Sequence, residues 1–147
     1  MVQDYLDSEI LKYLQRNSKL TYEEIGEIVD RSPSTVRDRI KKLEENKTIT
    51  GYSVIVDHEK MSINADAYVA VSLPSEEIES VEALKKVEGV SEILRVTGRR
   101  KIMFRLSATD NKTLSEIIDK KIRPLGFYDI EITMILEPVI RYPGKIE

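Results

Sequence analysis

The side chains best suited to binding chemistry lie between residues 31 and 47. This segment has six Arg or Lys residues against three acids, whereas residues 1–30 have three against seven. In a helix, at 100° per residue, one side of the segment carries Ser34, Thr35, Arg37, Asp38, Lys41 and Lys42. Hydroxyls, a guanidinium and a carboxylate in the first turns can read base edges, while later lysines hold phosphates. That order is typical of the recognition helix of a DNA-binding protein.

Two alternatives account for the same residues without DNA. A run of charges is usually only the solvated face of a helix. Three helices around an apolar core can also pack together with no affinity for DNA. The exposed hydroxyls and cations, considered together, favour DNA binding over both.

The chain has few groups for metal or nucleophilic chemistry. It contains no cysteine and one histidine, so thiolates are excluded and ligands for zinc or a transition metal are scarce. We expect His58 to be an exposed loop residue, because no second ligand type or paired nucleophile accompanies it. The sequence therefore predicts no metal, no cofactor and no enzymatic activity.

The overall charge excludes one way of binding DNA. Among 147 residues, 23 Lys and Arg stand against 26 Asp and Glu, for a net charge of −3. This balance excludes a protein that coats nucleic acid or anionic membrane through bulk positive charge. No apolar run approaches the ~20 residues of a transmembrane helix. We therefore expect a cytoplasmic protein with no membrane partner.

The first two helices are predicted from apolar spacing and capping residues. Apolar residues recur at helical intervals from Leu6 to Leu14, with Asp7 as the expected cap of the helix. Residues 21–24 have the form of a capping box, which starts a second helix. Gly26 within that helix favours a close approach between helices.

A short turn then leads to the third helix. Asp30 tolerates left-handed backbone, and Ser32-Pro33 supplies a capping hydroxyl and a proline at the first helical position. The buried seam of this helix is predicted to be Val36, Ile40 and Leu43. Residues 1–48 therefore predict a helix-turn-helix domain.

The rest of the chain changes from helical to alternating periodicity. Residues 49–56 are rich in β-branched side chains and predict a strand, either a wing or a hinge, in a linker over residues 49–63. Residues 64–147 then predict strands over 67–73, 91–97, 102–107 and 130–136, with helices over 81–87 and 110–122. This βαββαβ order is the ferredoxin-like arrangement, so the fold class is α+β, with an N-terminal (winged) helix-turn-helix. The sheet face opposite the helices is expected to be apolar, which predicts a partner subunit.

The sequence resembles the leucine-responsive/asparagine-regulator (Lrp/AsnC) family of bacterial and archaeal transcription factors. The matching residues are Leu6-Asp7, Ile10-Leu11, Leu14-Gln15, Ser32-Pro33-Ser34-Thr35-Val36, Arg39-Ile40-Lys41-Lys42-Leu43-Glu44, Ile49-Thr50-Gly51-Tyr52 and Val96-Thr97-Gly98. They span essentially the whole chain in the right order. The resemblance implies a helix-turn-helix, a hinge strand and a C-terminal effector and assembly domain. It also implies dimers formed through the open sheet faces, tetramers or octamers built from them, and small amino acids bound near the turn between the second and third strands.

Two segments depart from the family pattern. Asp30-Arg31 stands where the family usually has Gly-Leu, and Gly98-Arg99-Arg100-Lys101 stands where members often carry Gly-Asp-Tyr-Asp. A carboxylate is the natural partner of a ligand's ammonium group, so the cations at Arg99, Arg100 and Lys101 favour a carboxylate or phosphate effector instead. Alternatively, this turn carries only solvated cations and the regulator has no effector.

The function predicted is a sequence-specific transcriptional regulator that binds pseudo-palindromic double-stranded DNA as a dimer or higher oligomer. Two alternatives are kept. One is an effector-independent architectural DNA-binding protein. The other is an enzyme, because tetrapyrrole (sirohaem) decarboxylases resemble this family in architecture.

Overall fold

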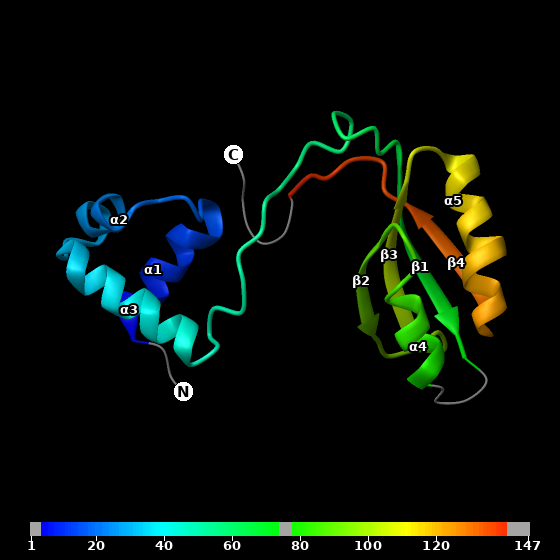
Figure 1. Ribbon diagram of the computed structural model, residues 1–147, viewed down its shortest axis with the longest axis horizontal. Coiled ribbons are helices and arrows are strands. Elements are labelled where there is room, and N and C mark those ends of the chain that lie inside the picture. The colour runs from blue at the N-terminus through cyan, green and yellow to red at the C-terminus, as the bar shows by residue number, and fades with distance from the viewer. Residues whose placement is uncertain (1–3, 74–77, 141–147) are drawn as a thin grey trace. The chain divides into compact units, whose positions relative to one another are not determined.

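The computed structural model describes residues 4–73 and 78–140. These residues belong to two compact units, one built on the chain up to Ile55 together with residues 138–140, and the other on Val56–Glu137. The first unit is helical and the second contains a sheet with its helices (Figure 1). The boundary therefore falls inside the segment 49–63 that the sequence assigns to the linker.

Three helices with well-formed caps make up the first unit. They are α1 (Tyr5–Arg16), α2 (Tyr22–Val29) and α3 (Pro33–Glu45). The capping box of α2 is confirmed, with Thr21 and Glu24 satisfying each other's backbone amides, and Ser32 caps α3 as predicted. The cap of α1 is Asp4, whose carboxylate accepts from Asp7 N at 2.8 Å, so the prediction of Asp7 was wrong by one turn.

The apolar stripes of the three helices meet in one core. Ile10 of α1, Ile25 of α2 and Val36 and Ile40 of α3 are buried together. The predicted seam of α3 is confirmed, since Leu43 is also buried. Burial of this seam leaves the opposite side of α3 on the surface.

Arg39 ties α3 to the beginning of α1. Its Nη1 donates to a carboxylate oxygen of Asp4 and lies 3.2 Å from Asp7 Oδ1. The hydrogen bond from the Asp7 amide, together with Arg39, lowers the pKa of Asp4 below its ordinary value. Arg39 is therefore a structural cation rather than a free one.

The turn between α2 and α3 passes very close to Gly26. A Cβ at this position would lie 2.6 Å from the carbonyl oxygen of Arg31. The missing side chain therefore makes room for the turn before α3, and not for a neighbouring helix as predicted. Asp30 is left-handed at φ 55°, as predicted.

The segment after α3 is not a strand. Residues 46–64 contain no assigned strand, so neither the predicted wing nor the hinge strand is observed in this described stretch. β-branched side chains favour extended backbone, but a strand also needs a neighbour to complete its hydrogen-bond ladder. The segment is held instead by Ile49 N donating to Leu43 O at 2.9 Å and by Tyr52 Oη donating to Glu44 Oε1 at 2.9 Å.

The second unit confirms the predicted βαββαβ order. Its elements are β1 (Ala65–Ser72), α4 (Ile78–Leu84), β2 (Val90–Arg95), β3 (Ile102–Ala108), α5 (Asn111–Ile117), a π-helical turn (Ile118–Ile122), a 3-10 turn (Arg123–Leu125) and β4 (Tyr128–Met134). The strands form one antiparallel sheet in the order β2-β3-β1-β4. The helices α4 and α5 cover one face of it (Figure 1).

The core of this unit lies between the sheet and its helices. Val69 of β1 and Phe104 of β3 are fully buried there against Leu84, Leu114 and Ile118. Helix α4 ends at Leu84, whereas the sequence predicted a helix over residues 81–87. Gly89 therefore lies beyond the helix rather than at its C-terminal cap.

The open face of the sheet carries polar and apolar side chains together, which corrects the expectation of an apolar face. Strand register places on it Asp66, Tyr68, Ala70, Glu92, Leu94, Met103, Arg105, Ser107, Glu131 and Thr133. Ile132 and Met134 pair with Val69 and Ala67, so they point to the helix-covered side. The alternating apolar series predicted for the strands belongs to the core, whereas the open side mixes charged and polar residues with Tyr68, Ala70, Leu94 and Met103.

Substitution of Gly89 tests the close contact between the loop after α4 and β3. Gly89 has φ +90°, and a Cβ there would lie 2.4 Å from Ser107 O. We expect Gly89→Ala to lower the free energy of unfolding by roughly 3 kcal/mol or more, because it adds a backbone clash to the cost of positive φ. Gly126→Ala is the matched control, with φ +96° and nothing within 4 Å, and should cost about 1 kcal/mol. Equal losses in urea denaturation would contradict the contact.

Candidate functional site

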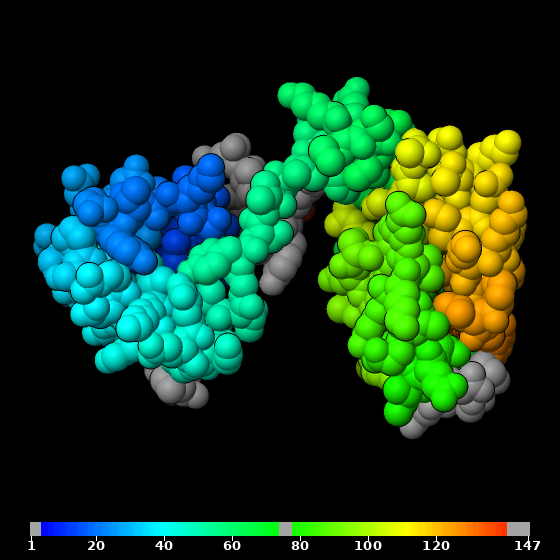
Figure 2. All heavy atoms as spheres, viewed as in Figure 1, coloured from blue at the N-terminus to red at the C-terminus, as the bar shows by residue number. Residues whose placement is uncertain are grey.

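The outer side of α3 carries all six residues that the sequence predicts for DNA contact. Ser34, Arg37, Asp38, Lys41 and Lys42 are exposed, and Thr35 is half-buried. In the space-filling view α3 lies open on the surface of the helical unit (Figure 2). The residues face solvent because Val36, Ile40 and Leu43 occupy the buried side of the same helix.

Three hydroxyls cluster at the beginning of α3. Ser32 Oγ lies 3.1 Å from Ser34 Oγ and 2.8 Å from Thr35 Oγ1, and it also accepts from Thr35 N at 3.2 Å. The hydroxyl of Ser34 remains on the exposed side, whereas that of Thr35 is partly enclosed. Both can act as donor or acceptor toward a ligand once they exchange their bond to Ser32.

The charged groups of the outer side are only loosely paired. Arg37 Nη2 lies 3.4 Å from Asp38 Oδ1, and Lys41 Nζ lies 3.9 Å from Glu45 Oε1. Among the described residues, Lys42 has no ion pair within 4.0 Å. Exposed pairs of this kind are weak and screened, so these cations are available to a phosphate or a base.

The structure reduces the set of available cations in the basic segment. Arg39 is engaged with Asp4 and Asp7, and Arg31 Nη1 donates to the carbonyl oxygen of Asp30 at 2.8 Å. The cations on the outer side of α3 are therefore Arg37, Lys41 and Lys42. Sequence counting cannot separate them from Arg39, whose partners lie more than 30 positions away.

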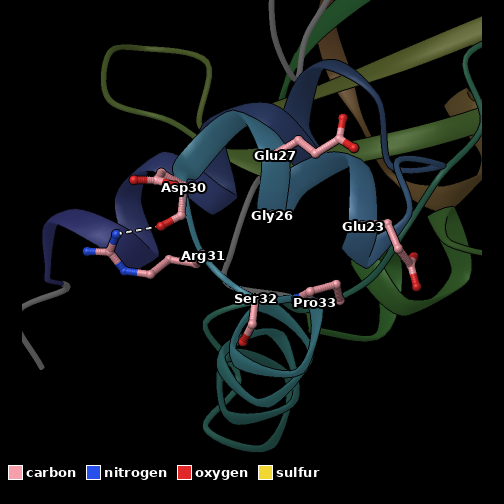
Figure 3. Close-up of a pocket in the computed structure, with 7 residues that line it drawn as sticks. All are labelled: Glu23, Gly26, Glu27, Asp30, Arg31, Ser32 and Pro33. Atoms are coloured by element: carbon pink, nitrogen blue, oxygen red, sulfur yellow. Dashed lines mark hydrogen bonds between the residues drawn. The ribbon is translucent and has the colours of Figure 1, made fainter.

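A hollow beside the turn has the opposite charge. It is lined by Glu23, Gly26, Glu27, Asp30, Arg31, Ser32 and Pro33 (Figure 3). Its lining residues carry three carboxylates and one guanidinium, and that guanidinium donates to Asp30 O. The hollow is therefore unsuited to phosphate, in contrast to the outer side of α3.

The turn predicted to hold an effector is engaged by β4. Arg99 Nη2 lies 3.1 Å from Asp129 Oδ2, and Arg100 Nη2 lies 3.2 Å from Asp129 Oδ1. Arg100 also donates from Nε to Asp129 O at 2.8 Å and pairs through Nη1 with Glu131 Oε2 at 2.9 Å. Gly98 bends the turn at φ +105°, and Lys101 is exposed.

Sequence reasoning missed Asp129 and Glu131. The predicted βαββαβ topology contained the signal, because the beginnings of the third and fourth strands lie at the same end of such a sheet. Asp129 has φ 51° beside a register shift between β1 and β4, so a bulge turns both its carbonyl and its carboxylate toward Arg100.

His58 is not the exposed residue that the sequence predicts. It is half-buried, and its Nδ1 lies 3.3 Å from Asp66 Oδ2 on the open sheet face. Asp66 also accepts from Arg105 at 2.5 and 3.0 Å and from Ser107 at 2.9 Å. Burial opposes ionisation of Asp66, but the bonds from Arg105 and Ser107 outweigh it and lower its pKa.

Neither metal binding nor membrane insertion is indicated for the described part of the chain. Residues 4–73 and 78–140 contain no cluster of three or more His, Asp or Glu side chains that could hold a metal ion. None of the helices described there is long and apolar enough to span a bilayer.

Solved structures share this fold along nearly the whole chain. AsnC of E. coli superposes with a TM-score of 0.84 at 23% identity, covering 96% of this chain and 97% of that one. A transcriptional regulator of Neisseria meningitidis, solved as a complex with L-Met, superposes with a TM-score of 0.87 at 24% identity, covering 97% and 96%.

Sequence comparisons identify both domains. Residues 3–50 match the winged helix-turn-helix DNA-binding family, and residues 66–144 match the Lrp/AsnC ligand binding domain. The HTH-type transcriptional regulator LrpA of Pyrococcus abyssi is 32% identical over 120 residues, covering 81% of this chain and 85% of that protein. The regulator LrpA1 of Halobacterium salinarum is 30% identical over 117 residues, covering 79% and 82%. The chain belongs to the Lrp/AsnC family of HTH-type transcriptional regulators.

Proposed function

We propose that this regulator reads pseudo-palindromic DNA through the outer side of α3, presented twice in a homodimer. The observation that carries the proposal is the order of groups along that side. Hydroxyls and Arg37 occupy its N-terminal half, while Lys41 and Lys42 follow in the C-terminal half. Two such helices related by a two-fold axis would enter major grooves about 10 base pairs apart, or a multiple of that.

The six residues on this side divide into proposed base contacts and phosphate contacts. Arg37 is placed on a guanine, because its guanidinium can donate two parallel hydrogen bonds to O6 and N7. Ser34, Thr35 and Asp38 contact neighbouring base edges. Lys41 and Lys42 bind phosphates and contribute affinity without sequence preference.

Paired substitutions on α3 separate base reading from phosphate binding. Arg37→Ala should relax sequence preference at one base pair, costing about 1–3 kcal/mol on the preferred site and little on random DNA. Lys42→Ala should weaken binding to the preferred site and to random DNA equally. It should also lower the slope of log affinity against log salt concentration by about one unit. Gel-shift titrations at two salt concentrations measure both effects, with Lys12→Ala on α1 as the control. Unchanged binding in both α3 variants would exclude this surface.

We propose that the homodimer forms through the open sheet face, with tetramers or octamers built from it. This face keeps charged groups such as Asp66 and Arg105 half-buried in mutual hydrogen bonds, so a second copy can cover it without leaving either group unpaired. The charged and polar groups among its apolar side chains favour a specific register over indiscriminate apolar association.

A bulky charge at the centre of the open face tests this dimer. Ala70 lies on that face between Met103 and Glu131, so Ala70→Arg should shift the protein toward monomer in sedimentation velocity. Glu116→Arg, on the exposed side of α5, is the control and should leave the oligomer unchanged. A dimer that survives Ala70→Arg would place the interface elsewhere.

The effector we propose is a small anion bound at Gly98, Arg99, Arg100 and Lys101. Three consecutive cations in an exposed turn suit a carboxylate or phosphate better than an ammonium group. The competing proposal is a regulator without effector, whose binding to DNA is architectural.

Calorimetry distinguishes these two proposals. Titration of the full chain with organic acids and nucleotides should release heat for at least one anion, and Arg99→Gln should weaken that binding several-fold. Lys85→Gln is the control, because it removes an exposed positive charge outside the turn. Absence of heat across the panel would support the regulator without effector.

We propose no enzymatic activity and a cytoplasmic location. A decarboxylase-like activity on this fold would need an acid, a base or a nucleophile placed in a cleft. The paired acids and bases described above, such as Asp66 with Arg105, satisfy one another on a sheet face. A regulator of transcription acts where the DNA is, which supports the cytoplasm.

A further inference from the structure

The carboxylate of Asp129 is held by two arginines of the turn between β2 and β3. Its Oδ2 lies 3.1 Å from Arg99 Nη2 and its Oδ1 lies 3.2 Å from Arg100 Nη2. One carboxylate between two guanidinium groups is the arrangement that those cations would make with an anionic ligand. Asp129 therefore occupies the position that such a ligand needs.

The two arginines differ in how firmly they are held. Arg100 is directed at β4 through three nitrogen atoms, which contact Asp129 O, Asp129 Oδ1 and Glu131 Oε2. Its side chain is 23% exposed, whereas that of Arg99 is 74% exposed and pairs, among the described residues, with Asp129 alone. Arg100 thus stays in place if the Asp129 carboxylate rotates away, because its bonds to the Asp129 carbonyl and to Glu131 remain.

The charges of the cluster select the class of ligand. Arg99, Arg100 and Lys101 carry three positive charges, while Asp129 and Glu131 carry two negative ones. A monoanion offers the two arginines no more negative charge than the Asp129 carboxylate that already contacts them. An oxyanion with two or more negative charges can replace that carboxylate and also engage the exposed Lys101.

We propose that Asp129 is a built-in competitor of the effector, which a small polyanionic ligand must displace from Arg99 and Arg100 in order to bind. This inference rests on the anion site proposed above and adds its regulation. The apparent affinity for the anion is lowered by the fraction of molecules in which Asp129 remains between the arginines. We therefore expect the site to bind polyanions and not monoanions.

Replacement of Asp129 by its uncharged isostere tests the competition. Asn tolerates the left-handed backbone found at this position, so Asp129→Asn removes the charge and keeps the bulge. Calorimetric titration with pyrophosphate and with citrate should show binding roughly fivefold tighter than in the unmodified chain. Glu131→Gln removes the same charge from the cluster but touches Arg100 alone, so it should have a clearly smaller effect. Thermal denaturation checks that each variant is folded.

The outcomes separate this inference from the proposed anion site. Tighter binding in Asp129→Asn, with acetate silent, supports the competition, and the stronger of the two probes identifies a phosphate or a carboxylate effector. Binding that is equal or weaker in Asp129→Asn, or a gain that Glu131→Gln matches, overturns the competition and leaves the anion site standing. No binding of either probe by the unmodified chain and by Asp129→Asn overturns both.

Discussion

The outer side of α3, which we propose contacts DNA, depends on the burial of one apolar seam. Val36 and Ile40 of α3 pack with Ile10 and Ile25. Because these side chains must all be buried, α3 has one rotational setting, and the groups on its other side must face outward. Arg39, at the edge of the seam, reaches the acids at the beginning of α1 and holds the helix across the bundle. The recognition surface is thus positioned by groups that do not belong to it.

Charge distribution restricts how DNA can approach this surface. The chain is acidic as a whole, and the hollow beside the turn carries carboxylates. Phosphates are therefore disfavoured next to α2 and favoured along α3, where Arg37, Lys41 and Lys42 are exposed. A net charge of −3 for the chain is compatible with DNA binding because three cations are exposed together along α3, away from the carboxylates of the hollow.

Local patterns predicted the fold well, and long-range pairing explains most of the errors. Capping residues, turn residues and the α3 seam are encoded within a few positions, so Ser32, Asp30 and Val36 behave as expected. The contacts of Asp129 and His58 join residues that are distant in sequence, and periodicity contains no information about them. Residues 49–56 have strand-forming side chains, but a strand depends on a neighbour that one segment cannot specify.

The bond between Tyr52 and Glu44 anchors one end of the connection that follows α3. Burial, together with Glu44, raises the pKa of Tyr52 to about 12, so its hydroxyl stays a donor at any ordinary pH. At the other end of the connection, His58 lies against Asp66 of β1. Residues 53–57 lie between these anchors, and the six Cα–Cα steps from Tyr52 to His58 span at most about 20 Å when extended. The chain between the two anchors therefore has a fixed upper length for as long as both contacts hold.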